Sequence, residues 1–164
     1  MSARGVHFAL TAPQVEAILA AKSDRKLMPL VEQIEEAWEK PFVVESDKAW
    51  DAIHRCLTDG SLLYDSGEYP LNLCICGGRQ LHRGGDYTVS FVSDLQARDV
   101  AMALDKVSKT WMRRRYFRLD PEEYNDVEIA EEDFRYTWQN FLDVRRFYRK
   151  AARAGRAVIF TVNA

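Results

Sequence analysis

The stretch from Glu131 to Asn163 constrains the fold of this 164-residue chain more than any other part of the sequence. At about 100° per residue, a helix over its first part places one set of apolar side chains on a single face: Phe134, Trp138, Phe141, Val144, Tyr148 and Ala152. Gly155 then supplies a left-handed stop, and the β-branched run Ala157 to Val162 is typical of a strand. The sequence therefore predicts a long C-terminal helix that leads into a final strand.

The size and composition of the chain favour one domain over residues 1–164. Hydrophobic residues make up 47% of the chain and charged residues 29%, and a chain of this length buries a core without metals or disulfides. The net charge of −2 gives little support to a general role in nucleic-acid binding. We therefore expect no nucleic-acid partner.

The location of the protein is predicted from its apolar runs and its cysteines. No apolar run is long enough for a signal peptide or a membrane span. Cys56, Cys74 and Cys76 are odd in number and few, unlike the disulfide framework of a secreted protein. These observations predict a cytoplasmic protein with no membrane partner.

Short strands and helices alternate along the rest of the chain. Thr11 and Gln14 form a capping-box pattern, as do Ser93 and Gln96. Before residue 60 the patterns predict a strand at 5–10, helices ending near Lys22 and spanning 27–40, an extended piece at 42–44, and a helix at 48–57 capped by Asp47. After it they predict a strand at 71–76, a glycine-rich loop at 77–86, a strand at 87–92, and helices at 93–109 and 110–117 with a further start at Asp120-Pro121-Glu122. The fold class predicted is α+β, a single domain with a small, mostly antiparallel or mixed sheet flanked by helices.

A metal site built on the cysteines is disfavoured by their spacing. Cys74 and Cys76 alternate along the predicted strand, and His54, Cys56 and His82 could join them in a zinc site. Structural zinc sites usually use a Cys-x₂₋₄-Cys pair, whereas this pair is Cys-x-Cys. Because free cysteine is also among the most buried residue types, we expect neither metal nor cofactor.

Two polar features have both a functional and a structural interpretation. The loop GGRQLHRGGDY combines four glycines with Arg79, His82 and Arg83 and could form an anion-binding nest, but an exposed hairpin connection is the simpler interpretation. His54 follows Trp50 by one helical turn, where a hydrogen-bonded structural histidine is more common than a general base. The sequence contains no catalytic signature.

Arginines occur in two unusual settings. The run Arg113, Arg114, Arg115 and Arg118 is most simply a solvated helix face. Arg145, by contrast, falls among the aromatic positions of the C-terminal helix, where we expect its side chain to be mostly buried. Because arginine keeps its charge, its guanidinium needs a carboxylate, backbone carbonyls or an aromatic face as a partner.

Four stretches of the chain resemble the YfbM-like family of small bacterial proteins, whose function is unassigned. They are DKAWDAIH at 47–54, ICGG at 75–78, the capped helix from Ser93, and VRRFYR at 144–149 with Gly155 and the strand after it. Positions that match the family pattern are Trp50, His54, Gly77, Gly78, Arg145, Phe147 and Tyr148. The chain departs from the pattern at Val127–Ala130, where the family often shows Tyr-Pro. The resemblance implies a single α+β domain and supplies no reaction.

Two functions remain open from the sequence. The first is a binding or interaction module with a protein partner, acting through the loops at Gly60–Tyr69 and Gly77–Asp86. The alternative is a small enzyme or anionic-ligand binder, whose pocket would be formed by Trp50, His54, Gly77, Gly78, Arg145 and Tyr148. A concave pocket would favour the second, and an exposed apolar patch the first.

Overall fold

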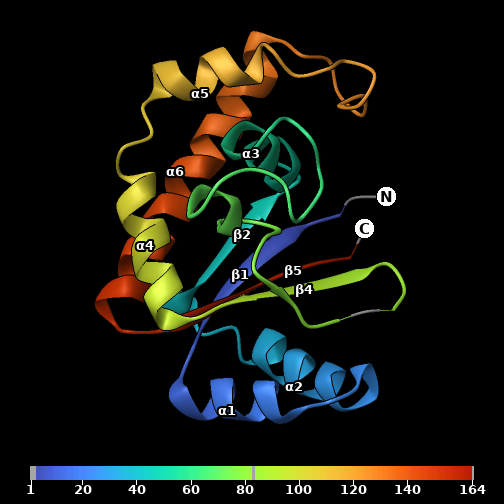
Figure 1. Cartoon of the computed structure of the whole chain (residues 1–164), viewed down its shortest axis with the longest axis vertical. Coiled ribbons are helices and arrows are strands. Elements are labelled where there is room, and N and C mark those ends of the chain that lie inside the picture. The colour runs from blue at the N-terminus through green and yellow to red at the C-terminus, as the bar shows by residue number, and fades with distance from the viewer. Residues whose placement is uncertain (1–2, 83, 164) are drawn as a thin grey trace.

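The final strand, β5 (Ala157–Asn163), lies in the middle of a five-stranded antiparallel sheet (Figure 1). The computed structural model describes residues 3–82 and 84–163. The sheet has the order β2-β1-β5-β4-β3, in which the other strands are β1 (Gly5–Leu10), β2 (Val43–Asp47), β3 (Arg79–Gln80) and β4 (Tyr87–Val92). Every neighbouring pair is antiparallel, with Phe8 opposite Ile159 and Phe91 also opposite Ile159. The predicted α+β class with a final strand after a long helix is confirmed.

Helices cover both faces of this sheet. Two helices, α1 (Ala12–Ala20) and α2 (Asp24–Ala37), pack on one face, below the sheet in Figure 1. On the other face lie α3 (Trp50–Leu57), α4 (Asp94–Leu104), α5 (Lys109–Tyr116) and α6 (Glu131–Arg153). Along β5, Val158 and Phe160 join the core beneath α6, while Ile159 joins the core against α1 and α2. A strand buried on both faces needs apolar residues at successive positions, which explains the apolar run in the sequence.

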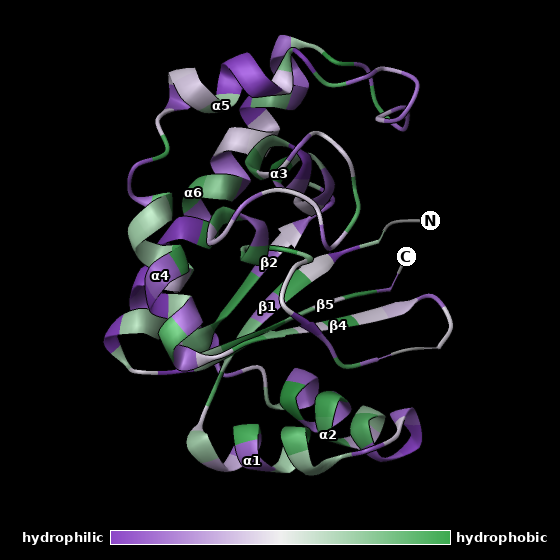
Figure 2. Ribbon diagram, viewed as in Figure 1, coloured by the Kyte–Doolittle hydropathy of each residue, from purple (hydrophilic) through white to green (hydrophobic). Residues whose placement is uncertain are grey.

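The helix α6 buries the face that its period predicts. Figure 2 shows both hydrophobic and hydrophilic residues along α6, and hydrophilic colour over most of α5. Phe134, Trp138, Phe141, Val144 and Tyr148 are all buried, as predicted. The last turn is rotated slightly from the prediction, because Ala151 is fully buried and Ala152 is only half-buried. Gly155 follows the helix with φ +65°, the left-handed conformation expected of a helix stop.

Arg145 meets the kinds of partner that were predicted, and most of its surface is covered. Its Nη1 donates to the Val107 carbonyl at 3.3 Å, and its guanidinium carbon lies 5.7 Å from the Phe141 ring centroid and 5.9 Å from that of Trp138. The residue is partly exposed, but its guanidinium meets a backbone carbonyl and aromatic rings, in line with the prediction. Desolvation still lowers its pKa from the usual value. The stem therefore packs on the aromatic rings while the charge stays near the surface.

Both capping boxes form as predicted. The Thr11 hydroxyl accepts from the Gln14 amide at 3.4 Å, and the Gln14 side chain accepts from the Thr11 amide at 2.8 Å. The corresponding bonds of Ser93 and Gln96 measure 3.2 and 2.9 Å. These reciprocal bonds satisfy amides that have no partner inside the helix, so they define where α1 and α4 begin.

The predicted strand at Leu71–Cys76 is wrong. The chain instead forms the 3-10 turn η2 (Leu71–Leu73) and further turns, and the hairpin partner of β4 is β3. Buried carbonyls in this segment are satisfied by distant side chains instead of a strand ladder. The Cys74 oxygen accepts from Tyr148 Oη at 2.9 Å, and the Cys76 oxygen accepts from Ser90 Oγ at 2.9 Å.

Other predicted helix boundaries also differ from the structure. No helix forms at Asp120-Pro121-Glu122, where the chain makes one turn closed by the Tyr124 amide on the Asp120 carbonyl at 2.9 Å and then stays irregular to Ala130. The helix α3 begins at Trp50 rather than Lys48, because Asp47 has φ +48° and its carboxylate accepts from Tyr136 Oη instead of capping. A break at 105–108 separates α4 from α5, which has Ser108 as its own N-cap. Among the described residues, none of the helices has the length and apolar character that crossing a bilayer requires.

Candidate functional site

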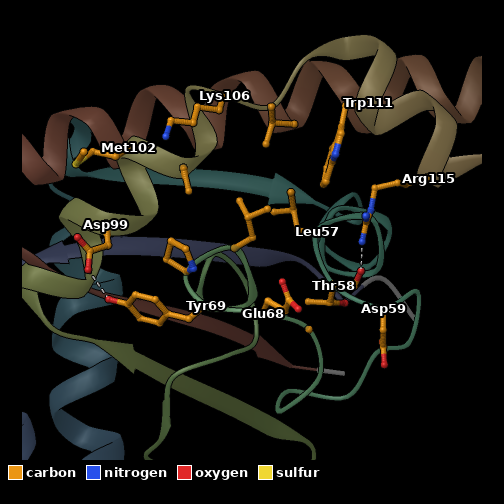
Figure 3. Close-up of a pocket in the computed structure, with 15 residues that line it drawn as sticks. Leu57, Thr58, Asp59, Glu68, Tyr69, Asp99, Met102, Lys106, Trp111 and Arg115 are labelled. Atoms are coloured by element: carbon orange, nitrogen blue, oxygen red, sulfur yellow. Dashed lines mark hydrogen bonds between the residues drawn. The ribbon is translucent and has the colours of Figure 1, made fainter.

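A cleft of about 800 Å³ lies between the loop after α3 and the helices α4 and α5 (Figure 3). We call it the loop–helix groove. Asp59 and Gly67–Leu71 line it from the loop, and the C-terminal residues of α3 close one end. The helical wall consists of Asp99, Met102, Ala103, Lys106, Val107, Trp111 and Arg115. Its volume falls within the range of small-ligand and peptide sites.

The floor of the groove is apolar and its rim is unusually exposed. Leu57 and Val107 in the floor belong to the main core. At the rim, the Met102 side chain is 66% exposed and the Tyr69 side chain is 56% exposed. Large apolar side chains held in water beside a concave surface are typical of binding sites. The exposed rim makes the groove a candidate binding site.

Tyr69 ties the loop to the helical wall. Its hydroxyl donates to Asp99 Oδ2 at 2.6 Å, and this hydrogen bond raises the pKa of the Tyr69 phenol. At the start of the same loop, Gly67 has φ +79° and lies so close to Thr58 that a Cβ would be 2.7 Å from the Thr58 Cβ. A glycine is required there for both reasons. The loop wall is thus held by specific contacts at both ends.

Arg115 forms the other end of the groove. Its Nε donates to the Cys56 carbonyl at 2.6 Å and its Nη2 donates to the Thr58 carbonyl, shown as a dashed line in Figure 3. A guanidinium at this position neutralises the carbonyl end of α3. The guanidinium also lies 4.5 Å from the Trp111 ring centroid. Arg115 therefore joins α5 to α3 and holds the Trp111 ring against the groove.

The groove carries charges of both signs. Asp59, Glu68 and Asp99 contribute carboxylates, whereas Lys106 and Arg115 contribute cations. Its described lining contains no histidine, cysteine or serine. The one hydroxyl near the floor, Thr58 Oγ1, donates to the His54 carbonyl at 2.7 Å and has no base beside it.

His54 forms hydrogen bonds to two other segments of the chain, one at Leu63 and one at Cys76. Its Nε2 donates to the Leu63 carbonyl at 2.8 Å, so its Nδ1 is free to accept from the Cys76 amide at 3.5 Å. Burial lowers the pKa of His54 from its ordinary value, which keeps the ring neutral. His54 thus fastens the loop at 61–69 and the turn at 74–77 onto α3.

Gly77, Gly78 and Tyr148 surround the same turn. A Cβ on Gly77 would lie 2.0 Å from the Asn72 carbonyl oxygen, and one on Gly78 would lie 2.5 Å from the Phe91 carbonyl oxygen. Tyr148 donates to the Cys74 carbonyl, and burial raises its pKa well above the usual range. None of these residues lines a described cavity, and their role in ligand binding stays a prediction.

Trp50 and Arg145 lie apart from this turn. Trp50 donates from Nε1 to the Ala3 carbonyl at 2.9 Å and lines a second cavity. Arg145 stands on α6 against the Val107 carbonyl and lines none of the described cavities. A ligand role for Arg145 also stays a prediction.

The groove residues Met102, Trp111 and Arg115 were not predicted as site residues, whereas Tyr69 ends a loop that was predicted as a binding surface. Arg115 belongs to the basic run that was interpreted as a solvated helix face, yet it is half-buried and bonded to α3. The useful signal was present in the sequence, because Trp111 precedes Arg115 by four positions and therefore shares its helix face.

Among the described residues, no group of three or more histidines, cysteines or acids is arranged to hold a metal ion. The three cysteines are free and buried. Arg79 and His82 of the glycine-rich loop lie outside the loop–helix groove, and Arg83 lies outside the described residues. His82 Nε2 instead stands 3.9 Å from the Asp24 carboxylate on α2.

We expect His54→Gln to lower the free energy of unfolding by about 1 kcal/mol, because a glutamine amide replaces only one of the two ring bonds. Urea denaturation of both proteins at pH 7 measures the difference. A variant as stable as the parent protein would contradict the structural role and would favour a role for His54 in ligand binding.

Comparison with known proteins shows which fold and family the chain shares. No curated protein matches the chain. The chain is similar to the crystal structure of YfbM, a protein of unknown function from Escherichia coli, with a TM-score of 0.73 and 19% sequence identity over 99% of each chain. A likeness at this identity shows a shared fold. The model of one family matches residues 1–161, and the chain therefore belongs to the family described as Domain of unknown function (DUF1877).

Proposed function

We propose that this protein is an interaction module that binds an extended segment of a partner protein in the loop–helix groove. The observation that carries the proposal is the exposure of Met102 and Tyr69 along a cleft whose described lining contains no histidine, cysteine or serine. A binding surface, unlike an active site, needs only shape, apolar contact and charge complementarity.

The residue types around the groove support this proposal. Tyrosine, tryptophan and arginine are the residues that most often dominate binding energy at protein interfaces. Tyr69, Trp111 and Arg115 supply one of each, and their hydrogen bonds and stacking hold them in place before a partner arrives. Met102 adds a flexible side chain that adapts to different apolar surfaces. Fixed anchors of this kind reduce the entropy lost on binding.

The shape and charges of the groove indicate what its occupant looks like. In Figure 3 the lining extends from Asp99 and Met102 at one end to Trp111 and Arg115 at the other, which suits a segment lying lengthwise. Glu68 projects from the loop wall and Lys106 from the turn between α4 and α5. A segment with apolar residues between charges of both signs would complement these walls.

The bacterial cytoplasm is part of the proposal. The structural relative comes from Escherichia coli. Cys56 and Cys76 are free thiols whose pKa values burial raises to about 12, which suits a reducing compartment.

The test is a selection of peptides from a random display library on the parent protein. Met102→Glu places a charge on the apolar rim, so we expect it to weaken the selected peptides at least about tenfold by fluorescence anisotropy. Leu95→Glu is the matched control, because Leu95 lies on the same helix, is 63% exposed and does not line the groove. A selection that yields no binder, or binders that are equally weakened by both variants, would overturn the proposal.

A further inference from the structure

A second cavity, of about 500 Å³, lies where the start of α3 meets the irregular segment before α6. We call it the acidic aromatic cavity. Trp50 and Asp51 line it from α3, and Tyr124 and Tyr136 line it from the irregular segment and from α6. Its remaining lining residues are Ala3, Lys48, Asp126, Val127, Glu128, Ala130, Glu132 and Asp133. Nothing in the function proposed above uses this cavity.

Each aromatic side chain in the cavity is held by a hydrogen bond. Trp50 Nε1 donates to the Ala3 carbonyl at 2.9 Å, and Tyr124 Oη donates to Asp133 Oδ2 at 2.7 Å. Tyr136 Oη donates to Asp47 Oδ2 at 2.6 Å and accepts from the Lys48 amide at 3.1 Å. The rings are therefore in place before any ligand enters, and a phenol that donates to a carboxylate gains electron density on its ring.

The carboxylates of the cavity fall into two groups. Asp51 pairs with Arg55 at 2.6 Å, and Asp133 accepts from both Tyr116 and Tyr124. Asp126, Glu128 and Glu132, by contrast, are exposed and have no hydrogen-bond or ion-pair partner among the described residues. Lys48 is the only cation among the described lining residues. The cavity therefore presents a surplus of negative charge beside aromatic rings.

The N-terminus of α6 explains the position of only some of these carboxylates. Acids in the first turn of a helix stabilise its positive end, and Glu132 and Asp133 lie in the first turn of α6. Asp126 and Glu128 lie in the irregular segment, outside any helix. Helix capping therefore does not account for these two carboxylates.

We propose that the acidic aromatic cavity binds an alkylammonium cation. The face of an aromatic ring attracts a cation, and its apolar surface packs against methyl or methylene groups. The exposed carboxylates of Asp126, Glu128 and Glu132 also attract a positive charge, so they favour a cation over a neutral molecule of the same shape. Because the volume is that of a small-molecule site, the occupant is a free organic cation rather than a macromolecule.

The experiment compares choline with its neutral carbon isostere, 3,3-dimethylbutanol, by nuclear magnetic resonance titration of the whole chain. Putrescine is the second cationic probe. We expect at least one of the two cations to bind with a dissociation constant below about 5 mM at low salt, and the neutral isostere to bind at least about tenfold more weakly. An alkylammonium group could also come from a methylated lysine of another protein, which a short peptide with one trimethyl-lysine represents. Tighter binding of this peptide than of either free cation would overturn the assignment to a free ligand.

Matched variants locate the binding. Glu128→Gln combined with Glu132→Gln removes two exposed charges from the cavity, and we expect it to weaken the cation at least about fivefold. Glu32→Gln combined with Glu36→Gln removes two exposed charges from α2, on the opposite face of the sheet, and should change affinity less than about twofold. Absence of cation binding, equal binding of the isostere, or equal effects of the two double variants would each overturn the proposal. None of these results bears on the loop–helix groove.

Discussion

Gly77→Ala is expected to lower the free energy of unfolding by about 4 kcal/mol. The added Cβ would lie 2.0 Å from the Asn72 carbonyl oxygen and 2.8 Å from its carbon. Both are backbone atoms, so no side chain can rotate away and the turn itself must move. That turn is held by His54 and Tyr148, and its movement would disturb their hydrogen bonds as well. Urea denaturation measures the loss of stability. A variant that is already partly unfolded without urea would also agree with the prediction.

Gly85→Ala is the matched control for this prediction. Gly85 has φ +71°, but nothing lies within 4 Å of the place where its Cβ would be. Its replacement should therefore cost only the backbone strain of a left-handed residue, about 1 kcal/mol. If the two substitutions cost the same, close packing against Asn72 would not be the reason for glycine at position 77.

Acid is expected to destabilise the protein through His7, by about 3 kcal/mol between pH 7 and pH 4. His7 is fully buried among Phe147, Tyr148 and Phe160, and its Nε2 donates to the Cys74 carbonyl at 2.7 Å. Burial lowers its pKa from 6.5 to about 4. Between these two values the unfolded chain binds a proton that the folded chain does not. Stability therefore falls as the pH drops below 6.5 and stops falling from this cause below about 4.

The variant His7→Gln isolates this contribution. Glutamine can still donate to the Cys74 carbonyl but does not titrate, so its unfolding free energy should depend less steeply on pH between 6.5 and 4. The lowered pKa of His54 adds a slope of the same sign in both proteins. Equal slopes for the parent protein and the variant, measured by urea denaturation at a series of pH values, would contradict the assignment to His7.

Local signals predicted the elements that local interactions form. The capping boxes at Thr11 and Ser93 depend on residues three apart, and both are present as predicted. The face of α6 also follows from a helical period, and it is buried at Phe134, Trp138 and Phe141. Such features can be predicted from a sequence because the residues that interact lie within one or two helical turns of each other.

Elements that depend on distant partners could not be predicted in this way. The apolar alternation at 71–76 is typical of a strand, but Tyr148, Ser90 and His7 bind its carbonyls and hold it as turns. Asp120-Pro121 has the pattern of a helix start, yet the chain there makes a single turn and continues as the wall of a cavity. In both places tertiary hydrogen bonds outweigh a local preference.

The candidate site shows the same limit. The loop at 60–69 was predicted as a binding surface, and its residues from Gly67 onward do line the groove. Its opposite wall comes from α4 and α5, some thirty or more residues later. Only the fold brings Tyr69 to Asp99 and Arg115 to Thr58, so no spacing in the sequence indicates the groove.

The central position of β5 has a consequence for how the protein is made. Synthesis proceeds from the N-terminus, so β1 and β4 leave the ribosome before the strand that pairs with both of them exists. Until residues 157–163 are available, each presents an unpaired edge, the surface through which strands of different molecules associate. Nascent chains halted before this point should therefore need chaperones, and a nonsense mutation within β5 should yield aggregates instead of a shortened protein with partial activity.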